Sequence, residues 1–403
     1  MGWLDDYIHF THAQESPTVF HRWVGISIIA STLGRDVWLD RRSDGVTRYK
    51  VYPGQLIIVL VAGSGRSRKS VGLNMSQPFL KAGGVRTIRG KSSPEAFLDE
   101  LSGKGVTPPP KDHSALLLLS EMSAFLSKQS YSEPLLDILM DLADAPDYFP
   151  FNTRGGGKIE LKNVCLSGLM ASTPISIGEA IPARAHSAGF LSRVMWIYAA
   201  KTDRINPLID FDDEFVDPAE IQRMEALKQD LFHRIKYAST MKGPFSVTKE
   251  AKDWYVDWYK NWVESPQGQG EGYPTRRGDH LLRVAMCIAV SERGDREITL
   301  EDLTHTDAML CDVEQHFDKV FLHIGHSQNA KNFQRIVDAI TVSGGVVPRN
   351  HLIKMVYKYF NNIEELSMTL RTLEAAGELK RGTDKMQSEF WWLPDHPDPS
   401  PQE

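Results

Sequence analysis

Short, continuously apolar runs alternate with segments of helical spacing in the first half of the chain. The runs are rich in leucine and β-branched residues, which is typical of strands buried on both faces of a sheet. They are QLIIVLV (55–61), ALLLLSE (115–121), NVCLSGLMAST (163–173) and FLSRVMWIYAA (190–200). Helical spacing recurs between them, over 69–80, 93–102 and 133–144. This alternation predicts an α/β domain with a largely parallel sheet.

Further elements flank or interrupt this series. Residues 17–33 have the spacing of a helix, and two short strands are predicted around the turn Ser43-Asp44-Gly45. The segment YFPFNTRGGGKIELKNV (148–164) predicts two more strands joined by a glycine-rich tip. The acidic stretch LIDFDDEFVDPAE (208–220) begins where the α/β domain is expected to end.

The second half of the chain is predicted to be helical. Helical periodicity dominates residues 218–326. Residues 331–393 then have the order helix, helix, helix, two strands, which is the order of a winged helix. The predicted parts are 1–52 (a helical and hairpin segment), 53–205 (the α/β core), 206–328 (a helical domain), 331–393 (a winged helix) and 394–403 (a disordered tail).

The composition is that of an ordinary globular protein. The 403 residues are 41% apolar and 24% charged, with a formal net charge of -6. No apolar run approaches the roughly 20 residues needed to span a bilayer, so no membrane partner is expected. The three cysteines lie far apart with no C-x-x-C pattern, which disfavours a disulfide framework or a zinc site. The acidic N-terminus does not resemble a signal peptide, so we expect a cytoplasmic protein.

Charge is distributed unevenly along the chain. Between Ala62 and Pro94 there are seven Lys or Arg residues and no Asp or Glu. The negative total disfavours a protein that coats nucleic acid non-specifically, whereas local basic surfaces suit one that handles phosphate groups.

The stretch AGSGRSRKS (62–70) lies between the first buried strand and a predicted helix. This setting suits a phosphate-binding loop, because backbone N–H groups and the positive end of the helix dipole face the phosphates. Lys69 and Ser70 have the spacing required for phosphate oxygens and for Mg²⁺, although Arg68 stands where the usual pattern has glycine. A basic strand-to-helix turn is the alternative. The predicted nucleotide site comprises Gly63, Ser64, Gly65, Arg66, Ser67, Arg68, Lys69 and Ser70.

Polar residues also end the next two buried strands. At the position of Ser120-Glu121, ATP-hydrolysing enzymes carry an Asp for Mg²⁺, often followed by a Glu that polarises the attacking water. Glu121 is therefore predicted to be catalytic, and Ser120 occupies the place of the Asp; a surface Glu at an ordinary strand end is the alternative. Ser172 or Thr173 ends the third strand and is predicted to contact the terminal phosphate, unless it only caps a helix.

Two further roles are predicted around this site. Arg193 lies just before the last buried strand and is a candidate catalytic residue, either as a sensor or as a finger that reaches the ATP of the next subunit. An ordinary surface arginine is the alternative. A Mg²⁺ ion would be held by the hydroxyls of Ser70 and Ser120.

Five segments together resemble a family of P-loop ATPases from phages and prophages. They are FHRWVGISIIASTLGRDVWLD, YPGQLIIVLVAGSGRSRKS, ALLLLSEMSAFLS, LKNVCLSGLMASTP and GFLSRVMWIY. The resemblance covers residues 7–205, and members have no known function or are described as helicase or primase-helicase components of replication modules. It implies a RecA- or AAA+-like P-loop core, the cofactors ATP and Mg²⁺, and the cytoplasm of a bacterial host. It also implies that Lys69 and Ser70 bind ATP, that Glu121 hydrolyses it, and that Arg68 is a family variant.

Two regions are predicted to contact nucleic acid. The tip with Arg154 and Lys158 lies between the strands of Glu121 and Ser172, where ring-shaped motors often grip DNA. In the C-terminal unit, the recognition helix 363–376 and the wing offer Thr369, Arg371, Thr372, Lys380, Arg381 and Lys385. An ordinary hairpin and a protein-docking module are the alternatives.

Tryptophans recur every four residues at Trp254, Trp258 and Trp262. This spacing places them on one face of a helix, which favours packing against a core or an interface over a base-stacking surface.

The resulting hypothesis is an ATP-driven DNA motor, a replicative helicase or helicase-like ATPase that forms a ring, often a hexamer in such families. It would act on single-stranded or forked DNA together with other replication proteins. The alternative is a loader or initiator that uses the winged helix for DNA or a partner and hydrolyses little ATP, as Ser120 suggests. A nucleotide-dependent regulatory or defence switch is a third possibility.

Overall fold

The computed structural model describes most of the chain as two compact units, residues 1–324 and 325–403. The described residues are 2–43, 45–63, 67–90, 92–107, 110, 112–126, 132–153, 157–181, 189–202, 205, 217–264, 273–321, 328–360, 362–375, 377–383, 389–394 and 396.

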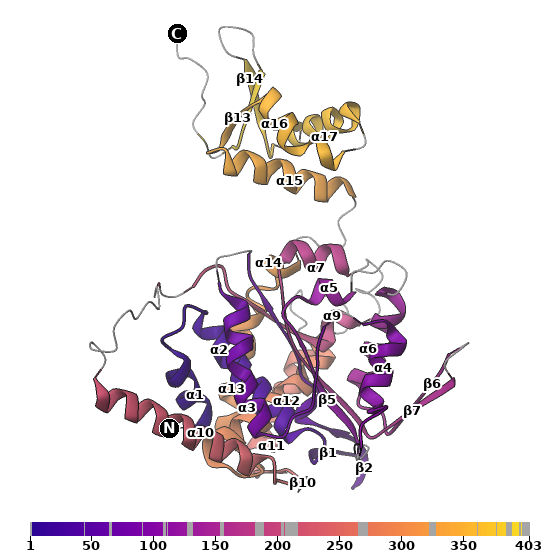
Figure 1. Ribbon diagram of the computed structural model, residues 1–403, viewed down its shortest axis with the longest axis vertical. Coiled ribbons are helices and arrows are strands. Elements are labelled where there is room, and N and C mark those ends of the chain that lie inside the picture. The colour runs from indigo at the N-terminus through magenta and orange to yellow at the C-terminus, as the bar shows by residue number, and fades with distance from the viewer. Residues whose placement is uncertain are drawn as a thin grey trace. The chain divides into compact units, whose positions relative to one another are not determined.

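A five-stranded parallel sheet forms the centre of the larger unit (Figure 1). Its strands are β3 (Ile57–Val61), β4 (Thr87–Ile88), β5 (His113–Leu119), β8 (Val164–Ser172) and β9 (Val194–Tyr198). Their order is β4-β5-β8-β3-β9, and every neighbouring pair is parallel. All residues of β3 and β8 are buried, as their continuous apolar runs require. The predicted α/β core with a parallel sheet is therefore confirmed.

Helices cover both faces of this sheet (Figure 1). On one face, α2 (Thr18–Leu33) and α3 (Lys69–Ala82) pack against each other and contact β8. On the other, α4 (Pro94–Ser102) and α6 (Ser132–Ala143) contact β5 and β8. Shorter helices join these elements: α1 (Trp3–Thr11), η1 (Pro53–Gln55), α5 (Met122–Leu126), α7 (Pro174–Ala180) and α9 (Phe190–Arg193).

Both predicted hairpins are present. The first consists of β1 (Val37–Ser43) and β2 (Val46–Val51), and β10 (Gly243–Pro244) pairs in parallel with β1 from far along the chain. The second consists of β6 (Tyr148–Thr153) and β7 (Gly157–Lys162) and stands apart from the central sheet. Asn163 donates to the Asp147 carbonyl at its base, so this hairpin leaves the core beside the first residue of β8.

The helical segment after the sheet belongs to the same unit. It comprises α10 (Pro218–Ala238), β11 (Ser246–Val247), α11 (Lys249–Glu264), α12 (Tyr273–Arg293), β12 (Glu297–Ile298), α13 (Leu300–Glu314) and α14 (Phe317–Phe321). Helices α10 and α12 contact α2, and one hydrophobic cluster runs from the sheet through these helices. The sequence predicts separate domains at 53–205 and 206–328, whereas the structure has one continuous core through both.

The smaller unit has its own core. Its elements are α15 (Gln328–Val342), β13 (Val346–Pro348), α16 (Arg349–Val356), η3 (Tyr357–Tyr359), α17 (Ile363–Ala375), β14 (Lys380–Thr383) and β15 (Glu389–Trp392). The predicted order of three helices followed by two strands is present, and β13 adds a third strand in the order β13-β15-β14. In neither unit is a described helix both long and apolar enough to cross a membrane.

Candidate nucleotide site

The order of the strands places a topological switch point at the carboxyl ends of β3 and β8. The chain leaves β3 for the far edge of the sheet at β4, whereas it leaves β8 in the opposite direction, across β3 to β9. Ligands of open α/β sheets bind where neighbouring connections diverge in this way. Val61 is level with Ser172, and Leu119 with Met170, so the residues that follow β3, β5 and β8 meet at one edge.

Lys69 is the first residue of α3 and lies over the end of β3. Its Nζ donates to the carbonyls of Ala62 at 2.8 Å and Gly63 at 3.4 Å. Burial lowers the pKa of Lys69, and the nearby charge of Glu121 opposes that effect. The lysine therefore lies close enough to Glu121 for their charges to interact. Ser70, the next residue, is exposed.

The rest of the loop is described only in part. Ser67 is 1% exposed, and its hydroxyl has no hydrogen-bond partner among the described residues. Arg68 precedes α3 in a left-handed conformation, with φ 39° and ψ 43°, and its exposed side chain forms an ion pair with Glu15. The side chain thus points outward, as a phosphate loop would require. Ser64, Gly65 and Arg66 of the predicted site lie outside the described residues.

Glu121 and Ser172 are brought together at the end of the sheet. The Ser172 hydroxyl donates to Glu121 Oε1 at 2.8 Å, and the Ser123 hydroxyl donates to the same oxygen at 2.8 Å. Ser172 is fully buried and Glu121 half-buried. Thr173 instead accepts a bond from Ser176 N at 3.1 Å and caps α7, the alternative that the sequence left open. Of the two residues, Ser172 is the one that orients Glu121.

Acidic metal ligands are sparse here. Ser120 is exposed and offers one hydroxyl, and Glu121 is the one carboxylate in the two positions directly after each strand of the sheet. No group of three or more His, Cys, Asp or Glu residues that could hold a metal is found in the described part of the chain. Mg²⁺ commonly keeps several waters and binds through one or two carboxylates plus substrate phosphates. Ser70, Ser120 and Glu121 fit that mode, although they do not form a dedicated cage.

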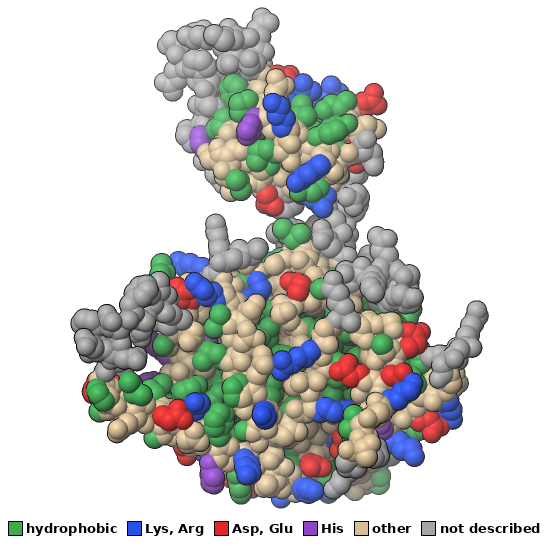
Figure 2. Space-filling model, viewed as in Figure 1, with side chains coloured by type: hydrophobic (Ala, Val, Ile, Leu, Met, Phe, Trp, Pro, Cys, Tyr) green, Lys and Arg blue, Asp and Glu red, His purple; other side chains and the backbone are tan. Residues whose placement is uncertain are grey.

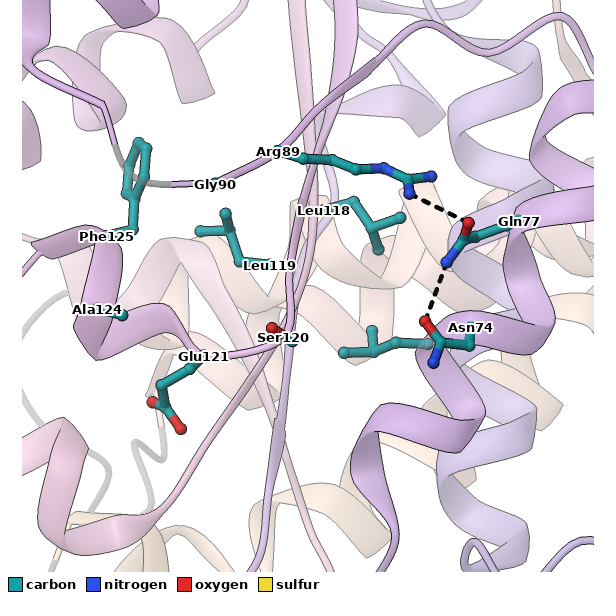
Figure 3. Close-up of a pocket in the computed structure, with 11 residues that line it drawn as sticks. Asn74, Gln77, Arg89, Gly90, Leu118, Leu119, Ser120, Glu121, Ala124 and Phe125 are labelled. Atoms are coloured by element: carbon teal, nitrogen blue, oxygen red, sulfur yellow. Dashed lines mark hydrogen bonds between the residues drawn. The ribbon is translucent and has the colours of Figure 1, made fainter.

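A cavity of about 310 Å³ lies on the other side of Glu121 (Figure 3). Arg89, which follows β4, donates from Nη1 to Gln77 Oε1 at 3.1 Å, and Gln77 Nε2 donates to Asn74 Oδ1 at 2.9 Å. The lining residues are Leu73, Asn74, Gln77, Arg89, Gly90, Leu118, Leu119, Ser120, Glu121, Ala124 and Phe125. Sequence reasoning missed this cavity; the one available signal was the i, i+4, i+7 spacing of Ser70, Asn74 and Gln77.

Arg193 lies at the opposite end of the sheet from Lys69. It immediately precedes β9, whose first residue is level with Ile57, the first residue of β3. A five-residue strand rises roughly 16 Å, so Arg193 cannot contact a ligand held by Lys69 of the same chain. Its Nη2 lies 2.8 Å from Asp144 Oδ2. The sensor role within one chain is therefore not supported, and a role towards a neighbouring subunit stays a prediction.

The predicted nucleic-acid contacts lie on both units. Lys158 is exposed on β7 but lies 2.5 Å from Glu160, and Arg154 lies outside the described residues. Arg371 is exposed on α17, and Lys380 and Arg381 on β14, although Arg381 contacts two carboxylates at 3.3 and 3.7 Å. On the face in Figure 2, basic and acidic side chains are interspersed over the larger unit.

One expected contact residue is buried. Thr369 is 5% exposed, and its hydroxyl donates to the Glu365 carbonyl at 2.8 Å within α17. It cannot contact DNA in this conformation, because its position on the helix faces the core. Lys385 lies outside the described residues.

No protein-family model matches this chain, and no curated protein matches it either.

Proposed function

We propose that this chain is an ATPase that binds ATP at the loop between β3 and α3. The observation that carries the proposal is the convergence of Lys69, Glu121 and Ser172 at the switch point of a parallel sheet. A lysine at the N-terminus of a helix that follows a buried strand suits phosphate groups, and a carboxylate held by two hydroxyls suits activation of water.

Each residue has a distinct role in the proposed reaction. The Lys69 ammonium leaves the carbonyls of Ala62 and Gly63 and contacts phosphate oxygens, where it neutralises developing charge. Glu121 orients the attacking water and accepts its proton, while Ser172 fixes one carboxylate oxygen. Mg²⁺ would be held by Ser70, with Ser120 and Glu121 nearby, and would neutralise the phosphates.

We further propose that several copies of the chain form a ring, such as a hexamer, and that ATP hydrolysis drives the movement of this ring along DNA. Two features support it. The β6–β7 hairpin lies along the chain between the strand that precedes Glu121 and the strand that ends at Ser172, and the C-terminal unit is separate and carries exposed Arg371 and Lys380. In such a ring, Arg193 of one subunit would leave Asp144 to contact the ATP of the next.

The loader or initiator is the second candidate, and the surface of α17 favours it. Met368 is 69% exposed and Ile363 is 42% exposed on the predicted recognition helix, and Glu364 is exposed beside them. Exposed apolar side chains beside an acidic residue suit a protein partner better than the phosphate backbone of DNA. The C-terminal unit would then recruit another replication protein.

The decisive experiment measures ATP binding and hydrolysis with and without single-stranded and forked DNA. We expect Lys69→Ala to abolish both, and Glu121→Gln to retain ATP binding while hydrolysis falls at least about 100-fold, the usual scale for losing a general base. Lys81→Ala is the matched control, because Lys81 is exposed in the last turn of the same helix.

Two outcomes separate the candidates. Wild-type protein without ATPase activity on any nucleic acid would rule out the motor. Strand displacement by the isolated protein would instead rule out a loader that hydrolyses little ATP.

A further inference from the structure

The cavity beside Glu121 is separate from the phosphate loop. Neighbouring strands lie about 4.8 Å apart, so β5 is about 10 Å and β4 about 14 Å from β3 along the sheet. The cavity lies between α3 and the ends of β4 and β5, whereas Lys69 lies over the end of β3. Glu121 borders both places, with its carboxylate engaged by Ser172 on the side of β8.

One wall of the cavity offers hydrogen-bond donors that the protein does not use. Arg89 is exposed, and in the described part of the chain Gln77 is the partner of its guanidinium, with no carboxylate in ion-pair contact. By contrast, Arg86 donates to three backbone carbonyls, which makes it a structural clamp. A guanidinium has five N–H donors, so most of those of Arg89 remain for a ligand. Figure 3 shows this guanidinium directed to Gln77, and the Glu121 carboxylate turned away from both.

Apart from Asn74, Ser120 and Glu121, the rest of the cavity lining is apolar or glycine. Leu73, Leu119, Ala124 and the ring of Phe125 line the cavity, and these side chains come from three different elements. A volume of about 310 Å³ is at the lower end for ligand sites, so there is room for one small ligand with a planar apolar part.

We propose that this cavity binds one nucleotide, with its phosphate on Arg89 and its base against the Phe125 wall. Guanidinium groups bind phosphate through paired hydrogen bonds, and side-chain amides such as those of Gln77 and Asn74 suit the polar edge of a base. The nucleotide is either a unit of single-stranded nucleic acid or a free nucleotide. The inference rests on the proposed ATPase function, because it makes this cavity the place where a second nucleotide controls Glu121.

The cavity lies close to the proposed catalytic groups. Asn74 lies one helical turn after Ser70 on α3, and Ser120 and Glu121 are both part of the lining. A ligand that binds Arg89 breaks its hydrogen bond to Gln77. The side-chain amides of Gln77 and Asn74 are then free to move, and Asn74 lies one helical turn from the phosphate loop. A nucleotide bound in the cavity therefore changes the rate of ATP hydrolysis rather than the affinity of the Lys69 site for ATP.

The test compares the wild type with Arg89→Ala, Gln77→Ala and the control Arg223→Ala, which removes a 71% exposed arginine of α10. Fluorescence anisotropy of a labelled oligo-dT and titration with a fluorescent ATP analogue give both affinities and the nucleotide stoichiometry. We expect the two cavity variants to bind one of these probes at least about tenfold more weakly, the scale of a lost charged contact to phosphate, with Arg223→Ala unchanged. ATP binding that depends on Lys69 should remain.

If the cavity variants lose both oligo-dT binding and the stimulation of ATPase activity by oligo-dT, the nucleotide bound in the cavity is a unit of nucleic acid. A fall from two bound ATP analogues to one identifies a free nucleotide. Wild-type binding of both probes by both cavity variants overturns the proposal and leaves the ATPase assignment intact. If the wild type has no ATPase activity but Arg89→Ala still weakens oligo-dT binding, the proposed function fails while the cavity remains a nucleotide site.

Discussion

At the scale of single residues, Arg68 explains how the loop departs from the usual pattern. Its backbone is left-handed, with φ 39° and ψ 43°, a conformation that costs a residue with a Cβ roughly 1–2 kcal/mol. Glycine adopts it without that strain, which accounts for the glycine of the usual pattern. The fold tolerates Arg68 because its side chain is 58% exposed and forms an ion pair with Glu15.

We predict that Arg68→Gly is more stable than Arg68→Ala by about 1 kcal/mol. Both variants lose the ion pair with Glu15, so their difference reports the left-handed backbone, where an added Cβ is unfavourable. Urea denaturation of the two variants measures this difference. Equal stabilities would show that the backbone at Arg68 is not strained.

At the scale of elements, one buried arginine joins three helices. Arg277 of α12 is fully buried and lies 2.5 Å from both Asp307 and Glu314 of α13. Trp258 and Trp262 of α11 lie over its guanidinium, at 5.2 and 4.1 Å to their ring centroids. The tryptophan stripe is therefore packing, as its spacing predicted, and the charge beneath it sets how the three helices meet.

Removing this arginine should be costly. We expect Arg277→Ala to destabilise the larger unit by about 3–5 kcal/mol, because it leaves Glu314 buried without a counter-charge. Chemical denaturation followed by tryptophan fluorescence measures the loss. Arg223→Ala, which breaks a surface pair with Glu220, should change stability by less than about 1 kcal/mol. Similar values for the two variants would contradict a structural role for the buried pair.

At the scale of the whole molecule, two hydrophobic cores support two units. The larger core extends from α1 through the sheet to α14, and the smaller one contains residues such as Ile336, Leu352 and Leu366. Each unit buries its own apolar surface, so each has its own source of stability. The candidate nucleotide site lies wholly in the larger unit.

Core substitutions should therefore act on one unit at a time. Leu366→Ala should lower the stability of the smaller unit by about 2–5 kcal/mol and leave ATP binding unchanged, since Leu366 is fully buried in the smaller core. Leu281→Ala, the matched change in α12, should instead destabilise the unit that binds ATP. Thermal unfolding with and without ATP analogue separates the two effects. Loss of ATP binding in Leu366→Ala would show that the units depend on each other.

The sequence by itself determined four of the five strands of the central sheet, whereas the edge strand β4 was not predicted, because its two residues are too few to show a pattern. QLIIVLV and ALLLLSE are too short and too continuously apolar for surface helices, and the pattern of residues 148–164 predicted the paired strands β6 and β7. It also placed Lys69 at the start of a helix and Glu121 just after a strand, because the ends of helices and strands follow from local pattern.

Only the tertiary structure decided which of these ends meet. The order that places β8 between β3 and β5 brings Ser172 to Glu121 and puts Arg193 at the far end of the sheet. The Arg89 cavity and the continuous core through α12 likewise depend on residues far apart in the chain. Local pattern reports which face of a segment is buried, whereas the partner of that face is chosen by the packing of all segments together.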